Sequence, residues 1–111
     1  NSIWFLIPNP IDGMDEYGYA NGYIGISDSI IKYCNSVKVS DLTDDNFLPS
    51  VGVTYNNYKI INGIKYLVIG WDTRCVGCNL KNYSKEKCIE MINEDYKFVV
   101  DYFDSAMMNR K

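Results

Sequence analysis

The architecture of this chain follows from residues 58–71, which read YKIINGIKYLVIGW. The dipeptide Asn62-Gly63 suits the positive φ angles of a type I′ turn, which joins two antiparallel strands through a two-residue loop. We therefore predict a β-hairpin whose strands span residues 51–61 and 64–71. One face of this hairpin is apolar, and we expect a helix to cover it. The residues of that face are Tyr58, Ile60, Leu67, Ile69 and Trp71.

A long helix near the end of the chain is the natural cover for the hairpin. Ser84 is suited to precede its first turn, and Glu86 lies in that turn, where the helix dipole favours an acidic side chain. We predict a helix from Ser84 to about Asp104, packed on the apolar face of the hairpin. The apolar residues that recur at helical spacing are Ile89, Ile92, Tyr96, Val99 and Phe103.

The first half of the chain supplies further strands and a short helix. Residues 3–7 are apolar on both faces, which predicts a buried strand. Asn21-Gly22 predicts a second hairpin turn, and Ser27 can cap a short central helix. Residues 40–46 are polar and predict a loop or a single short turn.

The order of these elements is strand, hairpin, helix, hairpin and helix, which is typical of an α+β protein. The predicted fold is an antiparallel sheet with hairpins. One face is covered by a long C-terminal helix and a shorter central helix. A chain of 111 residues, 47% of them hydrophobic, suits a single domain that spans residues 1–111.

The composition argues against several functional classes. The chain has no histidine, and histidine is the commonest general base, metal ligand and activator of a nucleophilic serine or cysteine. We therefore expect that the protein is not an enzyme and that it uses no cofactor. No apolar run approaches the ~20 residues that span a bilayer. We expect no membrane partner and a cytoplasmic location.

Acidic residues are concentrated in the first half of the chain. Residues 1–55 hold seven acids and two bases, a net charge of −5, whereas residues 56–111 hold seven acids and nine bases, a net charge of +2. An acidic half disfavours nucleic acid, whose phosphates require a basic surface, and suits a basic protein partner. We predict that two acidic clusters, with two tyrosines beside the first, bind this partner. These residues are Asp12, Asp15, Glu16, Tyr17, Tyr19, Asp41, Asp44 and Asp45.

Cys75 and Cys78 form a Cys-x-x-Cys motif after the second strand of the predicted hairpin. Residues 69–78 resemble the active-site stretch of thioredoxins, and this resemblance implies thiol–disulfide exchange through Cys75. The predicted helix begins six residues beyond Cys78, too far to lower the pKa of a thiol, so we predict that the pair is not catalytic. Zinc binding is the other alternative for these thiols. Its four ligands would be Cys34, Cys75, Cys78 and Cys88.

Two further resemblances bear on function. Residues 52–54, 66–70 and 84–89 resemble the final strands and helix of profilins, which implies an interaction module. In size, composition and layout, the whole chain resembles bacterial immunity proteins of the colicin or contact-dependent inhibition type. That resemblance implies a small acidic protein that docks on a basic toxin domain, often a nuclease, and excludes its substrate. Neutralisation of a toxin is the function that we predict.

Overall fold

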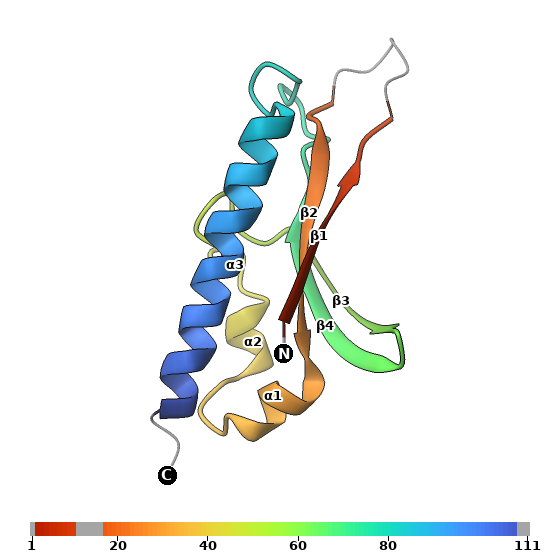
Figure 1. Ribbon diagram of the computed structural model, residues 1–111. Coiled ribbons are helices and arrows are strands. Elements are labelled where there is room, and N and C mark those ends of the chain that lie inside the picture. Colours follow the sequence, from red (N-terminus) through yellow and green to blue (C-terminus); the bar gives the residue numbers. More distant parts are fainter. Residues whose placement is uncertain (1, 11–16, 109–111) are drawn as a thin grey trace.

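The computed structural model describes residues 2–10 and 17–108, which form a sheet with helices on one side (Figure 1). The four strands are antiparallel and lie in the order β1-β2-β4-β3. The long helix α3 runs along one face, and α1 and α2 lie beside its C-terminal half. The predicted α+β class is confirmed. The elements are β1 Ser2–Pro8, β2 Ala20–Ser27, α1 Asp28–Tyr33, α2 Val39–Leu42, β3 Tyr55–Ile61, β4 Ile64–Trp71 and α3 Lys85–Met108.

The hairpin of β3 and β4 has the predicted turn and register. Asn62 and Gly63 have φ angles of 50° and 80°, as a type I′ turn requires, and Ile61 pairs with Ile64. The first strand begins at Tyr55, four residues later than predicted. The reason is that the preceding residues fold into turns, in which the amide of Gly52 donates to the carbonyl of Leu48 at 3.1 Å.

The predicted hairpin turn at Asn21-Gly22 is wrong, because both residues lie inside β2. Tertiary contacts determine the roles of the two residues. The Asn21 side chain accepts a hydrogen bond from the amide of Thr73 at 3.0 Å. Gly22 lies against the indole of Trp71, where a Cβ atom would collide with the ring. The glycine therefore makes room for a core side chain and does not provide a turn.

The strand predicted at residues 3–7 is present as β1, but its predicted burial is wrong. β1 is an edge strand that pairs only with β2 in the described part of the chain. Trp4 is 43% exposed and Ile7 is 51% exposed. Hydrophobic periodicity shows which residues share a face, but it does not show whether a strand is central or at an edge.

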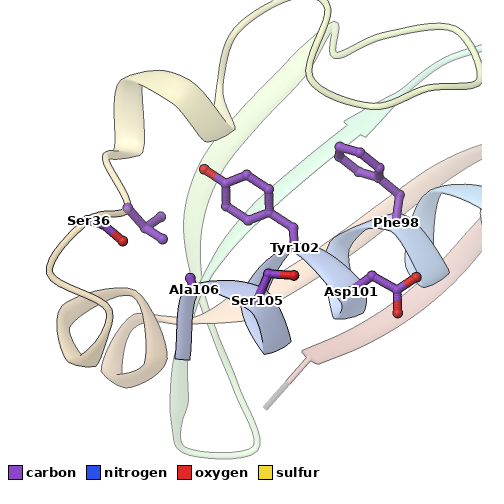
Figure 2. Close-up of a pocket in the computed structure, with 7 residues that line it drawn as sticks. Ser36, Phe98, Asp101, Tyr102, Ser105 and Ala106 are labelled. Carbon is purple, nitrogen blue, oxygen red and sulfur yellow. The ribbon is translucent and has the colours of Figure 1, made fainter. Parts of the chain in front are cut away.

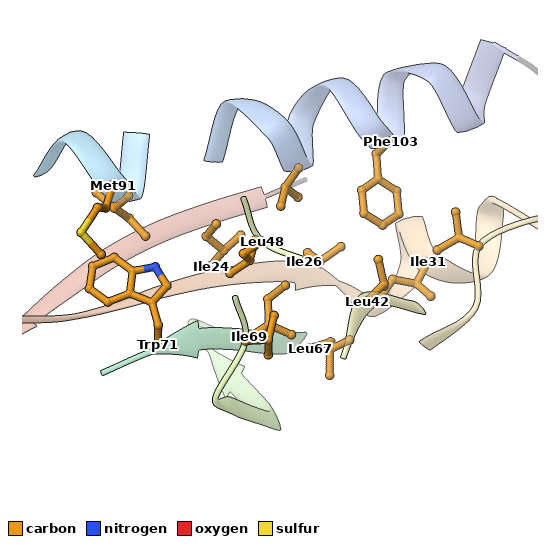
Figure 3. Packing of buried hydrophobic residues seen from close by; sticks show 14 of the residues in the cluster. Ile24, Ile26, Ile31, Leu42, Leu48, Leu67, Ile69, Trp71, Met91 and Phe103 are labelled. Atoms are coloured by element: carbon orange, nitrogen blue, oxygen red, sulfur yellow. The ribbon is translucent and has the colours of Figure 1, made fainter. Parts of the chain in front are cut away.

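The core lies between the sheet and α3, as predicted (Figure 3). The hydroxyl of Ser84 accepts a hydrogen bond from the amide of Lys87 at 3.1 Å and so caps the helix. The sheet contributes Ile24, Ile26, Leu67, Ile69 and Trp71, and the helix contributes Met91, Ile92, Val99 and Phe103. No helix within residues 2–10 and 17–108 has the length and apolar character that crossing a membrane requires.

Two details of the predicted packing differ. Tyr58 and Ile60 were expected to be covered, but they are 42% and 75% exposed, because the turn end of the β3–β4 hairpin curves away from α3 (Figure 1). Residues 40–46, predicted as a polar loop or one short turn, also add to the core. The short turn is present as α2 and buries Leu42, and Leu48 just beyond the predicted range is buried as well.

A buried carboxylate of α3 holds the loop before β3 against the core through hydrogen bonds. Asp95 of α3 is fully buried. One of its oxygens accepts from the indole nitrogen of Trp71 at 2.8 Å and from the Ser50 hydroxyl at 2.5 Å, and the other accepts from the Ser50 amide at 3.0 Å. The carboxylate thereby joins α3, β4 and the loop before β3, and all three of its donors come from outside its own helix.

Candidate partner-binding surface

Three of the predicted partner-binding residues lie together on α2 and the turn that follows. Asp41, Asp44 and Asp45 are all exposed. The Asp44 side chain accepts from the amide of Asn46 at 2.9 Å, and the Asp45 carbonyl accepts from the amide of Val53 at 2.8 Å. These local hydrogen bonds fix the backbone of the acidic turn, and one of them holds the Asp44 carboxylate.

An aromatic cluster lies next to these acids. The ring centroid of Phe47 is 5.3 Å from that of Phe98 and 5.1 Å from that of Tyr102, and both pairs are edge-to-face. Phe98 remains 37% exposed. Edge-to-face pairs are a favoured geometry of aromatic rings and limit their motion. The cluster therefore presents a fixed apolar surface to solvent.

A depression of about 360 Å³ adjoins this cluster. Figure 2 shows the side chains of Phe98, Asp101, Tyr102 and Ser105 extending from successive turns of α3, with Ser36 on the opposite side. Aromatic carbon and a carboxylate thus line the same shallow depression. Glu94 lies one helical turn before Phe98 and is also exposed.

The pKa of Tyr102, a residue of α3, is affected by an acidic residue of α2. Burial raises the pKa of the Tyr102 phenol above its ordinary value, and the negative charge of Asp41 raises it further. Asp101 makes a salt bridge with Lys97, at 2.7 Å from its Nζ atom. We call this region the acidic surface and define it by its carboxylates, which are Asp41, Asp44, Asp45, Glu94 and Asp101.

The two predicted tyrosines lie elsewhere. The ring of Tyr17 is 4.6 Å from the guanidinium carbon of Arg74, and the amide of Tyr19 donates to the carbonyl of Tyr83 at 2.8 Å. Tyr83 precedes α3, whereas Tyr102 lies in its second half. At 1.5 Å per residue, the tyrosines are therefore about 28 Å along the helix from Tyr102, and about 17 Å from Glu94 at the near end of the acidic surface. Asp12, Asp15 and Glu16 lie outside the described residues.

Sequence reasoning found the acids of α2 but missed the aromatic residues and the α3 acids beside them. One signal was present in the sequence. Phe98 and Tyr102 extend the apolar face of α3 beyond the width that a core contact needs, and Glu94 and Asp101 flank Phe98 at helical spacing. The contact of Phe47 with both rings arises only from the tertiary fold.

The cysteines do not converge on one site. Cys75 and Cys78 form a disulfide, in which Cys75 is exposed and Cys78 is buried. Cys34 and Cys88 are buried in the core, and burial raises the pKa of the Cys88 thiol. Among the described residues, no three side chains of the metal-binding types come together. The four-thiolate arrangement considered from the sequence therefore does not form here.

Comparisons with protein-family models, with curated proteins and with solved structures found no match. The function is therefore inferred from the chemistry of the surface.

Proposed function

We propose that this chain is a small acidic binding protein, and that it neutralises a basic protein toxin by docking on it through the acidic surface. The observation that carries the proposal is the environment of Phe98. This partly exposed ring lies beside Phe47 and Tyr102, and Glu94 and Asp101 flank it on α3. Arginine and lysine have apolar stems and cationic ends, so their side chains suit an aromatic surface edged by carboxylates.

The arrangement suits rapid and selective binding. Complementary charge steers two proteins together, and aromatic side chains in a contact slow their dissociation. A nuclease binds the phosphates of its substrate through a basic surface. An acidic protein seated on that surface would exclude the nucleic acid. This chain would then act as an inhibitor, and its contacts would compete with those of the substrate.

The test is affinity capture from the source organism with the wild-type chain and two variants. The first variant, called the α2 variant, reverses the acids of α2 and of the turn that follows it, with Asp41→Lys, Asp44→Lys and Asp45→Lys. The control reverses three exposed acids outside the acidic surface and therefore has the same net charge. Its substitutions are Asp72→Lys, Glu86→Lys and Glu90→Lys.

The wild type and the control are expected to retain the same basic protein, and the α2 variant to lose it. Raising the salt concentration should slow association of the wild type by roughly one to three decades. For neutralisation, the captured protein should arrest growth when expressed alone and not when expressed with the wild-type chain. A retained protein with an acidic contact face, or equal retention by all three chains, would contradict the proposal.

Thiol–disulfide exchange is the second candidate, and the exposure of Cys75 favours it. An external thiolate can reach the Sγ atom of Cys75 and displace the buried Cys78. An activated thiol is the missing feature, because α3 begins only at Lys85 and Cys75 does not lie in its first turn, where the helix dipole lowers the pKa of a thiol. This candidate ranks below the binding function for that reason.

The state of this disulfide also bears on the proposed cytoplasmic location. Disulfides persist in oxidising compartments, whereas the cytoplasm keeps most thiols reduced. In a cytoplasmic protein, Cys75 and Cys78 would therefore be free thiols. Alkylation of the native protein followed by mass spectrometry measures this directly. Two modified cysteines at these positions are expected for a cytoplasmic protein, and an unmodified pair would place it in an oxidising compartment.

A further inference from the structure

The edge strand β1 has the composition of a strand from the middle of a sheet. Its residues Ser2–Pro8 read SIWFLIP and include no charged side chain. Apolar residues occupy both of its faces, as in strands of a sheet that is buried on both faces. Nevertheless, only β2 pairs with it within the described residues. One row of its backbone N–H and C=O groups therefore faces outward.

The opposite edge of the same sheet is protected differently. β3 spans Tyr55–Ile61 and carries Lys59 together with Asn56 and Asn57. A lysine on an edge strand is a common device that prevents pairing with another chain, since pairing would bring its charge into the contact. β1 has no such residue, and only Pro8 interrupts its end. The two edges therefore differ in their readiness to accept a further strand.

We propose that β1 pairs antiparallel with β1 of a second copy of this chain, which joins two sheets into one. The strand is self-complementary about Phe5. In that register, Ile3 lies opposite Ile7 of the second copy on the open face, and Trp4 lies opposite Leu6 on the face toward α3. Antiparallel pairing about a twofold axis gives each copy the same contacts.

Charge favours a second copy over a partner selected electrostatically. The chain carries a net charge of −3, so two copies repel each other least where the surfaces that meet carry no charged side chain. β1 provides such a surface. The acidic surface lies on α2 and α3, so its carboxylates are not part of this contact. A basic partner could form no salt bridge with β1, because the strand has no acidic side chain.

The open face of the sheet extends the apolar contact. The ring of Phe5 stacks on Tyr23 with 5.2 Å between their centroids, and Tyr23 packs edge-to-face on Tyr55 at 5.3 Å. These rings connect β1 to the far edge of the sheet across its uncovered side. The residues of β1 that point to this side thus continue into an aromatic layer, and a second copy would lengthen that layer.

The expected dimer is weak, because the contact is small. A strand of seven residues is about 23 Å long and a sheet is about 10 Å thick, so the paired edges bury on the order of 500 Å². Stable interfaces generally exceed about 1,000 Å². Backbone hydrogen bonds therefore provide most of the affinity, as in other cases of strand addition. Self-association should become visible only at high protein concentration.

Sedimentation equilibrium of the wild-type chain between about 10 μM and about 1 mM tests this proposal. The mass-average mass is expected to rise from the 12.8 kDa of one chain toward twice that value. Ile7→Lys should weaken the dimer by about tenfold or more, because it places a charge on each side of the contact. The control is Ile60→Lys, which adds the same charge to the exposed edge strand β3 and should leave self-association unchanged.

Hydrogen exchange of the wild type provides a second measurement that needs no variant. The outward amides of residues 2–8 should exchange more slowly at high than at low protein concentration. A mass of 12.8 kDa across the whole range overturns the proposal. So does exchange in β1 that is independent of concentration, or a dimer that Ile60→Lys disrupts as much as Ile7→Lys.

Discussion

Replacing Asp95 with asparagine should destabilise the domain far more than a loss of charge on the surface. The asparagine amide has one acceptor oxygen in place of two. In its better orientation, it keeps the bonds from the Trp71 indole and the Ser50 hydroxyl, and its NH₂ group faces the Ser50 amide. The Ser50 N–H then loses its acceptor and faces the NH₂ donors, at a cost of about 1–3 kcal/mol, and two bonds to a carboxylate become weaker bonds to a neutral oxygen. Removing a buried carboxylate offsets part of this loss.

The expected net loss is about 2–3 kcal/mol in the free energy of unfolding. That is a large share of the total for a domain of this size, about 5–15 kcal/mol. Urea unfolding, followed by tryptophan fluorescence and by far-UV circular dichroism, measures the change. Asp101→Asn is the matched control, because it removes a carboxylate from the same helix at an exposed position, where an ion pair contributes little. A loss below about 0.5 kcal/mol for Asp95→Asn would refute the reasoning.

Three further predictions follow from the fold. Ile92→Asp should prevent folding, because it places an unpaired charge in the core; a melting temperature within a degree of the wild-type value would contradict this packing. Gly63→Ala should cost about 1 kcal/mol through backbone strain at φ 80°, whereas Gly22→Ala should cost more because its Cβ meets the Trp71 indole. Urea titration of both variants ranks these losses, and equal values would contradict the contrast. Replacing Cys75 and Cys78 with serine should leave partner binding intact, and the wild type should not accelerate the reduction of insulin; acceleration that Cys75→Ser abolishes would promote the redox function.

Local signals predicted the elements whose contacts are also local. The turn at Asn62-Gly63 formed because its neighbours on both sides can pair directly, and the cap at Ser84 bonds within its own first turn. The same dipeptide at Asn21-Gly22 does not form a turn. Asn21 accepts a hydrogen bond from Thr73, and Gly22 makes room for Trp71. Both partners are about 50 residues distant in the sequence, so no local pattern predicts these contacts.

The position of Asp95 shows a similar limit. The spacing of the α3 residues places it on the buried face, where a carboxylate is costly unless it has partners. Its partners Trp71 and Ser50 come from β4 and from the loop before β3, so only the tertiary structure explains why it is there. Likewise, the acidic cluster on α2 was visible in the sequence, but its contact with the α3 aromatics was not. β1 could be predicted as a strand, but its edge position depends on the pairing of the whole sheet.

The measurement that tests the binding proposal most directly is a hydrogen-exchange footprint of this chain in complex with the captured basic partner. Exchange should slow in α2, in the turn at residues 43–47 and in the α3 turns around Phe98, because these segments form the acidic surface. The loop that carries Cys75 and Cys78, together with strand β3, serves as the internal reference and should not change. Protection confined to that loop or to the open face of the sheet, with α2 and Phe98 unaffected, would contradict the account.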